Sequence, residues 1–185
     1  MKHRLPDPLR LDLVGFTADG GALEGVWSGS DLSRLADCQT TPQDSSAPPV
    51  QWQLQGERVT TALGDPELWL RLKADTTVWL TCQRCLQPFE VPLKVDRRIR
   101  FVRDETQAET MDAESEDDVL ALPRWLDGRE LIEDELLLAL PLVPRHARCP
   151  QALDMSTAAD EQSDEAAGER PNPFAVLKAL KAGKP

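Results

Sequence analysis

The sequence predicts an α+β fold: a mainly antiparallel sheet with one principal helix packed near it. Two patterns carry this prediction. Apolar residues occupy every second position through the centre of the chain, and an apolar stripe with helical spacing follows over residues 128–140. Strands that succeed one another through short connections, without helices between them, favour antiparallel pairing.

The N-terminal part is predicted to hold short elements. Leucines alternate with polar residues over residues 9–13, which predicts an extended segment, and residues 23–27 suit a short strand. The Ser-Asp pair at 30–31 is typical of a helix start and predicts a brief helical turn over residues 32–36. Residues 38–49 are rich in Ser, Thr and Pro and are expected to form a loop.

The centre of the chain has the clearest strand pattern. Apolar or small residues occupy the even positions of 68–82, with charged residues at several odd positions between them. This alternation predicts one long half-buried strand, or two strands with a kink near Asp75. Its expected partners are residues 50–54 and 58–63 before it and residues 89–102 after it.

A helix is predicted after the sheet. Asp127 and Glu130 have the spacing of a capping box, and Pro141 is expected to end the helix. The consecutive acids of residues 133–135 are interpreted as a solvated helix face rather than as catalytic carboxylates.

The charge is concentrated in two acidic runs. The net charge is −11, yet residues 104–118 hold eight acids and residues 160–169 hold five, with no bases in either run. The rest of the chain is close to neutral, so the bulk charge says little about its partner. The predicted organisation is one α+β domain over 1–150 with an acidic disordered insertion at about 104–120, an acidic linker at 151–170 and a helical tail at 171–185.

The sequence predicts a cytoplasmic protein with no membrane or DNA partner. No run approaches the roughly 18 apolar residues that span a bilayer, and residues 1–13 do not have the pattern of a signal peptide. In that compartment the four cysteines are better interpreted as thiols or metal ligands than as disulfides.

Two of these cysteines form a CxxC pair, Cys82 and Cys85, at the end of the long strand, and His146 and Cys149 form an HxxC pair beyond the helix. Together they would make a tetrahedral set suited to one structural zinc, the only cofactor that the sequence suggests. Alternatively, Cys82 is a small buried residue of its strand and the others are incidental. Redox chemistry is disfavoured because reactive CxxC pairs usually lie at a helix start.

A basic run follows the CxxC pair. Residues 94–103 carry five cations and one acid, a pattern compatible with contact to RNA phosphates. The same residues would equally suit a solvated strand, or a strand paired with the acidic run that follows. The candidate RNA-binding residues are Arg84, Lys94, Arg97, Arg98, Arg100 and Arg103.

The tail has the pattern of a short amphipathic helix. Asn172 is the expected N-cap, Pro173 the first helical residue, and Phe174, Leu177 and Leu180 have three-residue spacing. This segment either binds a partner groove or folds back on the sheet.

Three segments in order, CQRCLQPFEVPL, LIEDELLLALPLVPRH and PNPFAVLKALK, resemble the bacterial YceD family from about Trp69 to Lys181. The matching residues are Cys82, Arg84, Cys85, Phe89, Glu133, Glu135, Pro141, Pro144, Asn172, Pro173 and Phe174.

The resemblance implies a non-enzymatic ribosome-biogenesis factor that acts in the synthesis, processing or stability of 23S rRNA. Its expected partner is 23S rRNA or a precursor large-subunit particle. The alternative is an adaptor that binds a ribosomal protein or an assembly enzyme through its tail helix and acidic segments.

Overall fold

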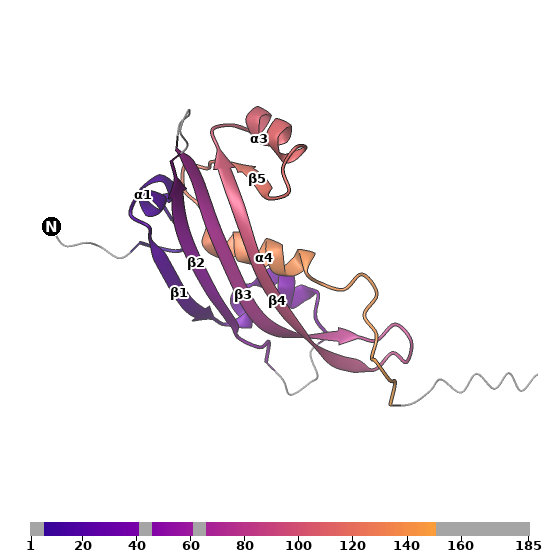
Figure 1. Cartoon of the computed structure of the whole chain (residues 1–185). Coiled ribbons are helices and arrows are strands. Elements are labelled where there is room, and N and C mark those ends of the chain that lie inside the picture. The colour runs from indigo at the N-terminus through magenta and orange to yellow at the C-terminus, as the bar shows by residue number, and fades with distance from the viewer. Residues whose placement is uncertain (1–5, 41–45, 61–65, 151–185) are drawn as a thin grey trace, which may run out of the picture. The chain divides into compact units, whose positions relative to one another are not determined.

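The computed structural model describes residues 6–40, 46–60 and 66–150. Within them, five strands form one sheet in the order of the sequence (Figure 1). The strands are β1 (Ala22–Trp27), β2 (Val50–Val59), β3 (Glu67–Thr81), β4 (Pro88–Val102) and β5 (Asp118–Ala121). Neighbouring strands from β1 to β4 are antiparallel, whereas β5 is parallel to β4. The predicted α+β class is therefore confirmed.

The helical elements lie before the sheet, between its strands and after it. They are α1 (Leu13–Ala18), the 3-10 turn η1 (Gly29–Asp31), α2 (Ser33–Asp37), α3 (Glu105–Asp112) and α4 (Gly128–Leu138). Asp127 caps α4 by accepting hydrogen bonds from the N–H groups of Arg129 and Glu130, as its sequence pattern predicted. No helix in the described part of the chain is long and apolar enough to cross a membrane.

Two predicted strand boundaries differ from the structure. The N-terminal leucines make only a single antiparallel bridge, between Leu11 and Leu126, because Asp12 caps α1 and the helix begins at Leu13. The two segments expected at 50–54 and 58–63 are one continuous strand, β2, up to Val59. Residues 61–65 lie outside the described part.

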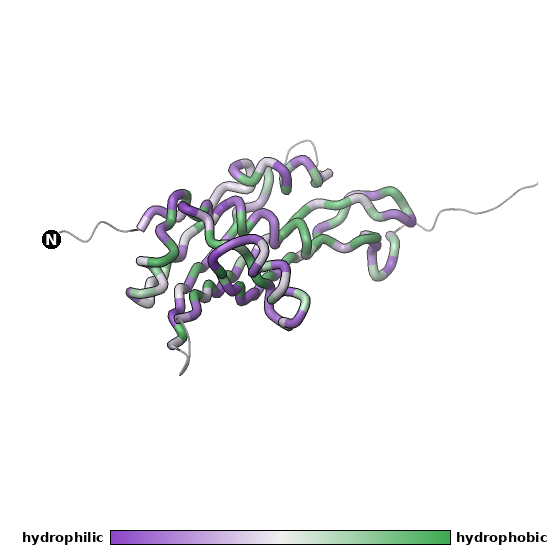
Figure 2. Tube along the Cα trace, turned by 90° about the horizontal axis from the view of Figure 1, so that it is seen from above, coloured by the Kyte–Doolittle hydropathy of each residue, from purple (hydrophilic) through white to green (hydrophobic). Residues whose placement is uncertain are grey.

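The core lies on one face of the sheet. Side chains alternate between buried and exposed along β2 and β3, and hydrophilic and hydrophobic residues alternate along the strands in Figure 2. The inward-facing residues Leu70, Leu72 and Ala74 belong to one buried cluster with Ile132 and Leu136 of α4. Helices α1 and α2 contribute to the same cluster, so this face is covered and the opposite face of β1–β4 is largely open.

The acidic run at 104–120 is structured, contrary to the disordered insertion that its charge suggested. Asp104 caps α3 by accepting a hydrogen bond from the N–H of Gln107. Ala108 of α3 and Val119 of β5 pack on Val102 of β4 in a small second cluster. The acids remain largely in solvent, so the charge density did not prevent these few apolar residues from ordering the segment.

Glu133 connects α4 to α2. It is only 7% exposed, and its carboxylate accepts hydrogen bonds from the N–H of Leu35 at 3.1 Å and from Arg34 Nε at 3.0 Å. The solvated face expected for residues 133–135 is therefore wrong for Glu133 and for Glu135, which is 8% exposed.

We expect Glu133→Ala to lower the free energy of unfolding by about 2–3 kcal/mol, because it leaves the buried N–H of Leu35 without its acceptor and removes a charge-assisted bond. The matched control is Asp134→Ala, which removes an ion pair to the same arginine at a more exposed position and should cost less than about 1 kcal/mol. Urea denaturation measures both. Equal costs for the two variants would contradict a structural role specific to Glu133.

Candidate metal centre

The β3–β4 hairpin extends beyond the rest of the sheet. Strand β2 pairs with β3 only as far as Asp75, whereas β3 and β4 remain paired up to Thr81 and Pro88. Residues 76–81 and 88–93 therefore form a two-stranded arm, visible at the lower right of Figure 1. The turn at its end, residues 82–87, carries the CxxC pair.

Backbone hydrogen bonds shape this turn. The N–H of Cys82 donates to Gln87 O at 3.0 Å, and the N–H of Leu86 donates to Cys82 O at 2.9 Å. Leu86 has φ of 57°, the only positive value at a non-glycine residue in the described part of the chain. This left-handed residue reverses the chain directly after Cys85, so that both cysteines belong to one tight turn.

The segment after α4 packs against the same turn (Figure 1, orange). The N–H of Gln83 donates to Pro144 O at 2.9 Å, and the N–H of His146 lies 3.4 Å from Cys82 Sγ. The rings of Phe89 and His146 pack with centroids 4.5 Å apart. These contacts bring the HxxC pair to the CxxC pair, which the sequence left open.

Four ligand atoms converge there. Cys82, Cys85, His146 and Cys149 offer three sulfurs and one imidazole nitrogen, all within 4.8 Å of one another. Cys82 Sγ and Cys149 Sγ are 3.8 Å apart, and Cys85 Sγ and His146 Nδ1 are 3.4 Å apart. A tetrahedral zinc with bonds of about 2.3 Å to sulfur and about 2.0 Å to nitrogen separates its ligand atoms by about 3.5–3.8 Å. This Cys3His centre is therefore able to hold one metal ion, and its donors suit zinc.

Hydrogen bonds around the centre favour the thiolate form of Cys82, whereas burial raises the pKa of Cys85. Burial raises the pKa of Cys82, but N–H donors from His146, Cys85 and Arg84 outweigh burial and lower that pKa to about 5. Arg84 Nε donates to Cys149 Sγ at 2.9 Å, and Arg84 Nη2 donates to His146 O at 3.2 Å. Arg84 thus supports the ligand residues from outside the ligand set, where hydrogen bonds orient the ligands of metal sites.

The predicted basic residues of β4 do not share one face. Lys94, Arg98 and Arg100 are on the open face, where each meets a carboxylate: Asp75 at 3.3 Å, Glu57 at 3.3 Å and Glu67 at 2.7 Å, respectively. Arg98 also lies over the ring of Trp69, 3.9 Å from its centroid. The N–H of Arg103 donates to Gln107 Oε1 at the start of α3.

Arg97 points to the covered face, where its Nε lies 3.4 Å from Glu135 Oε2 of α4. The sequence did not reveal these acidic partners, because they come from other strands and from α4. The tail residues Asn172, Pro173, Phe174, Leu177 and Leu180 lie outside the described part of the chain, as does the linker at 151–170.

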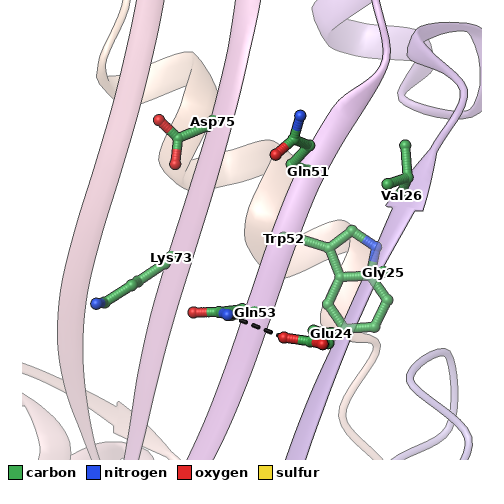
Figure 3. Close-up of a pocket in the computed structure, with 8 residues that line it drawn as sticks. All are labelled: Glu24, Gly25, Val26, Gln51, Trp52, Gln53, Lys73 and Asp75. Carbon is green, nitrogen blue, oxygen red and sulfur yellow. Dashed lines mark hydrogen bonds between the residues drawn. The ribbon is translucent and has the colours of Figure 1, made fainter.

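The open face also carries a shallow hollow of about 370 Å³ over β1–β3 (Figure 3). It is lined by Glu24, Gly25, Val26, Gln51, Trp52, Gln53, Lys73 and Asp75. Gln53 donates to Glu24 at 3.0 Å, while Lys73 and Asp75 pair with Asp96 and Lys94 of β4. The charges at this hollow are satisfied within the sheet, in contrast to the concentrated ligand set of the Cys3His centre.

The fold and the centre define a small α+β protein with a Cys3His cluster at the end of a β-hairpin. The family model for large ribosomal RNA subunit accumulation protein YceD matches residues 70–181, more than half of the chain. The chain therefore belongs to the YceD family. The match includes all four ligands of the centre.

A full-length relative agrees with this assignment. A Haemophilus influenzae protein described as large ribosomal RNA subunit accumulation protein YceD is 28% identical over 192 aligned positions, which cover 97% of this chain and 98% of the relative. No solved structure gives a significant match.

We expect the purified protein to contain one zinc per chain and to lose it in the variant Cys82→Ser/Cys85→Ser. Metal loss should lower the free energy of unfolding, by about 4 kcal/mol where free zinc stands at a thousand times its Kd. Elemental analysis and thermal unfolding with and without a chelator measure the two effects. The control is Cys38→Ser, since Cys38 is exposed and outside the centre. Unchanged unfolding after complete metal removal would contradict a structural metal.

The buried carboxyl of Glu135 leads us to expect that the stability of the protein depends on pH. Burial, followed by the charge of Asp118, raises its pKa, while Arg97 opposes this shift. A carboxyl whose pKa is raised in the folded state destabilises that state when ionised, and the penalty disappears as the pH falls through the raised pKa. Glu135→Gln should therefore stabilise the protein at pH 7, with a gain that shrinks towards pH 4.5.

Asp96 provides a control of opposite sign, because its hydrogen bonds with Arg71 lower its pKa. Asp96→Asn should therefore destabilise the protein at pH 7, and this loss should diminish as the pH falls through the lowered pKa. Unfolding curves from pH 7 down to about pH 2.5 measure both trends, because the Asp96 contribution changes only below the ordinary aspartate pKa of about 3.9. If the free energies of unfolding of wild type and Glu135→Gln differed by the same amount at every pH, the raised pKa of Glu135 would be contradicted.

Proposed function

We propose that this protein is a non-enzymatic ribosome-biogenesis factor that acts in the cytoplasm and supports the accumulation of 23S rRNA. The observation that carries the proposal is its membership of the YceD family, together with the near-complete coverage of a relative described as a large ribosomal RNA subunit accumulation protein. We further propose that its partner is 23S rRNA or a precursor large-subunit particle.

The contacts of the acidic triad at 133–135 support a non-enzymatic role. Glu133 accepts hydrogen bonds from α2, Asp134 pairs with Arg34, and Glu135 pairs with Arg97 of β4. Glu133 and Asp134 connect α4 to α2 and Glu135 contacts β4, so the two matching family residues Glu133 and Glu135 have structural contacts that need no catalytic role. The Cys3His centre likewise suits a structural ion, because protein side chains fill all four positions of a tetrahedron and leave none for substrate.

In cells that lack this protein, we expect the ratio of 23S to 16S rRNA and the amount of large subunits to fall. Expression of the wild-type chain or of Cys38→Ser should restore both. Cys82→Ser/Cys85→Ser should restore them poorly, since loss of a metal bound at the Cys3His centre would destabilise the hairpin end. RNA quantification and sucrose gradients measure the outcome at matched protein levels. An unchanged ratio of 23S to 16S rRNA in the deletion strain would contradict the role in accumulation.

Crosslinking in growing cells, with RNA sequencing and mass spectrometry on the same eluate, separates direct from indirect action. Discrete 23S rRNA sites are the result expected for direct contact. The adaptor alternative would instead be favoured by two results together: no crosslinks to RNA, and a crosslinked protein partner that is lost when residues 171–185 are deleted.

A further inference from the structure

At the end of the β3–β4 arm, basic residues occur without acids beside them in the same two segments. Residues 82–89 and 141–150, which we call the hairpin tip, contain three arginines and no Asp or Glu. The hydrogen bond from Gln83 to Pro144 joins the two segments, and the four side chains of the Cys3His centre converge between them. Segments that are far apart in the sequence thus combine their charge at one point of the fold.

The hairpin tip differs from the basic run in β4 that the sequence emphasised. There, Lys94, Arg97, Arg98 and Arg100 each lie within 3.4 Å of a carboxylate. A phosphate that approached these four cations would compete with the carboxylate that already pairs with each of them. The run is basic in sequence but largely neutralised in the folded sheet.

Arg145 and Arg148 at the tip are exposed and have no ion pair or hydrogen bond from their side chains within residues 6–40, 46–60 and 66–150. Arg84 is engaged with the centre instead. Three thiolates, a neutral imidazole and Zn²⁺ sum to one negative charge, which Arg84 offsets. The charges of Arg145 and Arg148 therefore remain available to an anionic partner.

The same tip exposes apolar side chains. Leu86 protrudes from the CxxC turn, and Leu142 and Val143 are exposed in the segment that leads to the ligands. Single-stranded RNA presents phosphates and unstacked base faces together, and compact metal-held loops are one of the known ways to bind it. A duplex hides its base faces and fits this mixture less well.

We propose that the hairpin tip binds single-stranded RNA, with Arg145 and Arg148 on the phosphates and the exposed leucines against the bases. This inference rests on the proposed function and names the surface that makes the RNA contact. The bound metal would fix the two segments, so that the arginines project from an ordered surface.

The test measures binding of the full metal-loaded chain to fluorescein-labelled single-stranded fragments of 23S rRNA, about 30 nucleotides long, with a duplex of the same sequence beside them. Arg145→Ala/Arg148→Ala should weaken binding to the single strands about tenfold at 0.15 M salt, since each phosphate contact contributes about fourfold there relative to 1 M. The slope of log K against log salt should fall by about 1.4. The unfolding temperature and metal content should not change.

The matched control is Lys73→Ala/Lys94→Ala, which removes two positive charges from the open face of the sheet. We expect it to weaken binding less than twofold. Equal weakening by both variants would show attraction by bulk charge and overturn the assignment to the tip. Full binding by the tip variant, no binding by the wild type, or tighter binding to the duplex would also overturn it.

The proposed function fails separately from this inference. If loss of the chain lowers the 23S to 16S ratio and Arg145→Ala/Arg148→Ala restores it fully, the accumulation role stands and the tip contact is wrong. If the ratio is unchanged in the deletion strain but the purified full chain binds single strands through the tip as expected, the RNA contact stands and the accumulation role fails. Crosslinks from the tip to a protein alone would reject RNA as its partner.

Discussion

The register between β3 and β4 is the constraint on which both the core and the metal centre depend. It runs from Leu68 opposite Phe101 to Thr81 opposite Pro88. Because side chains alternate along a strand, this one register turns Leu70, Leu72 and Ala74 towards α4 and sends the charged residues between them to the open face. It also ends the hairpin between Thr81 and Pro88, which places both cysteines of the CxxC pair in the turn. A shift by one residue would exchange the two faces and displace the turn.

Helix α4 covers the core face of the sheet and positions the second pair of ligand residues of the metal centre. Its apolar side packs on β3 and β4, and Glu133 and Glu135 attach it to α2 and to β4 through hydrogen bonds and ion pairs. The direction of α4 sends the following segment along the hairpin arm, where His146 and Cys149 reach the turn. The metal centre is thus a consequence of how the helix docks on the sheet, and an ion bound there would tie the end of the chain's described part to the hairpin.

The pairing of the strands also determines the distribution of charge on the sheet. Antiparallel pairing sets acids of one strand beside cations of the next, as with Arg71 and Asp96, which form two hydrogen bonds of 2.8 Å. The open face consequently carries a series of ion pairs, most of which are exposed and add little stability, while the pair of Arg100 and Glu67 is half-buried. The hairpin tip has no acids in its two segments, so Arg145 and Arg148 are not paired with a carboxylate there. This contrast leaves two arginines beside the metal centre without ion pairs in the described part of the chain, whereas four of the cations of β4 meet carboxylates.

The sequence by itself determined the class of the fold, the long central strands and the helix capped by Asp127, because period-two and helical patterns are local properties of a chain. It also determined which four residues suit a metal and which family the chain resembles. Tertiary structure decided what depends on contacts between distant residues. Only the packing of the segment after α4 on the hairpin turn united the ligands, and only strand pairing showed that the basic run of β4 meets carboxylates. The order in the acidic segment was likewise decided by Ala108 and Val119 packing on Val102, a contact that no local charge pattern reveals.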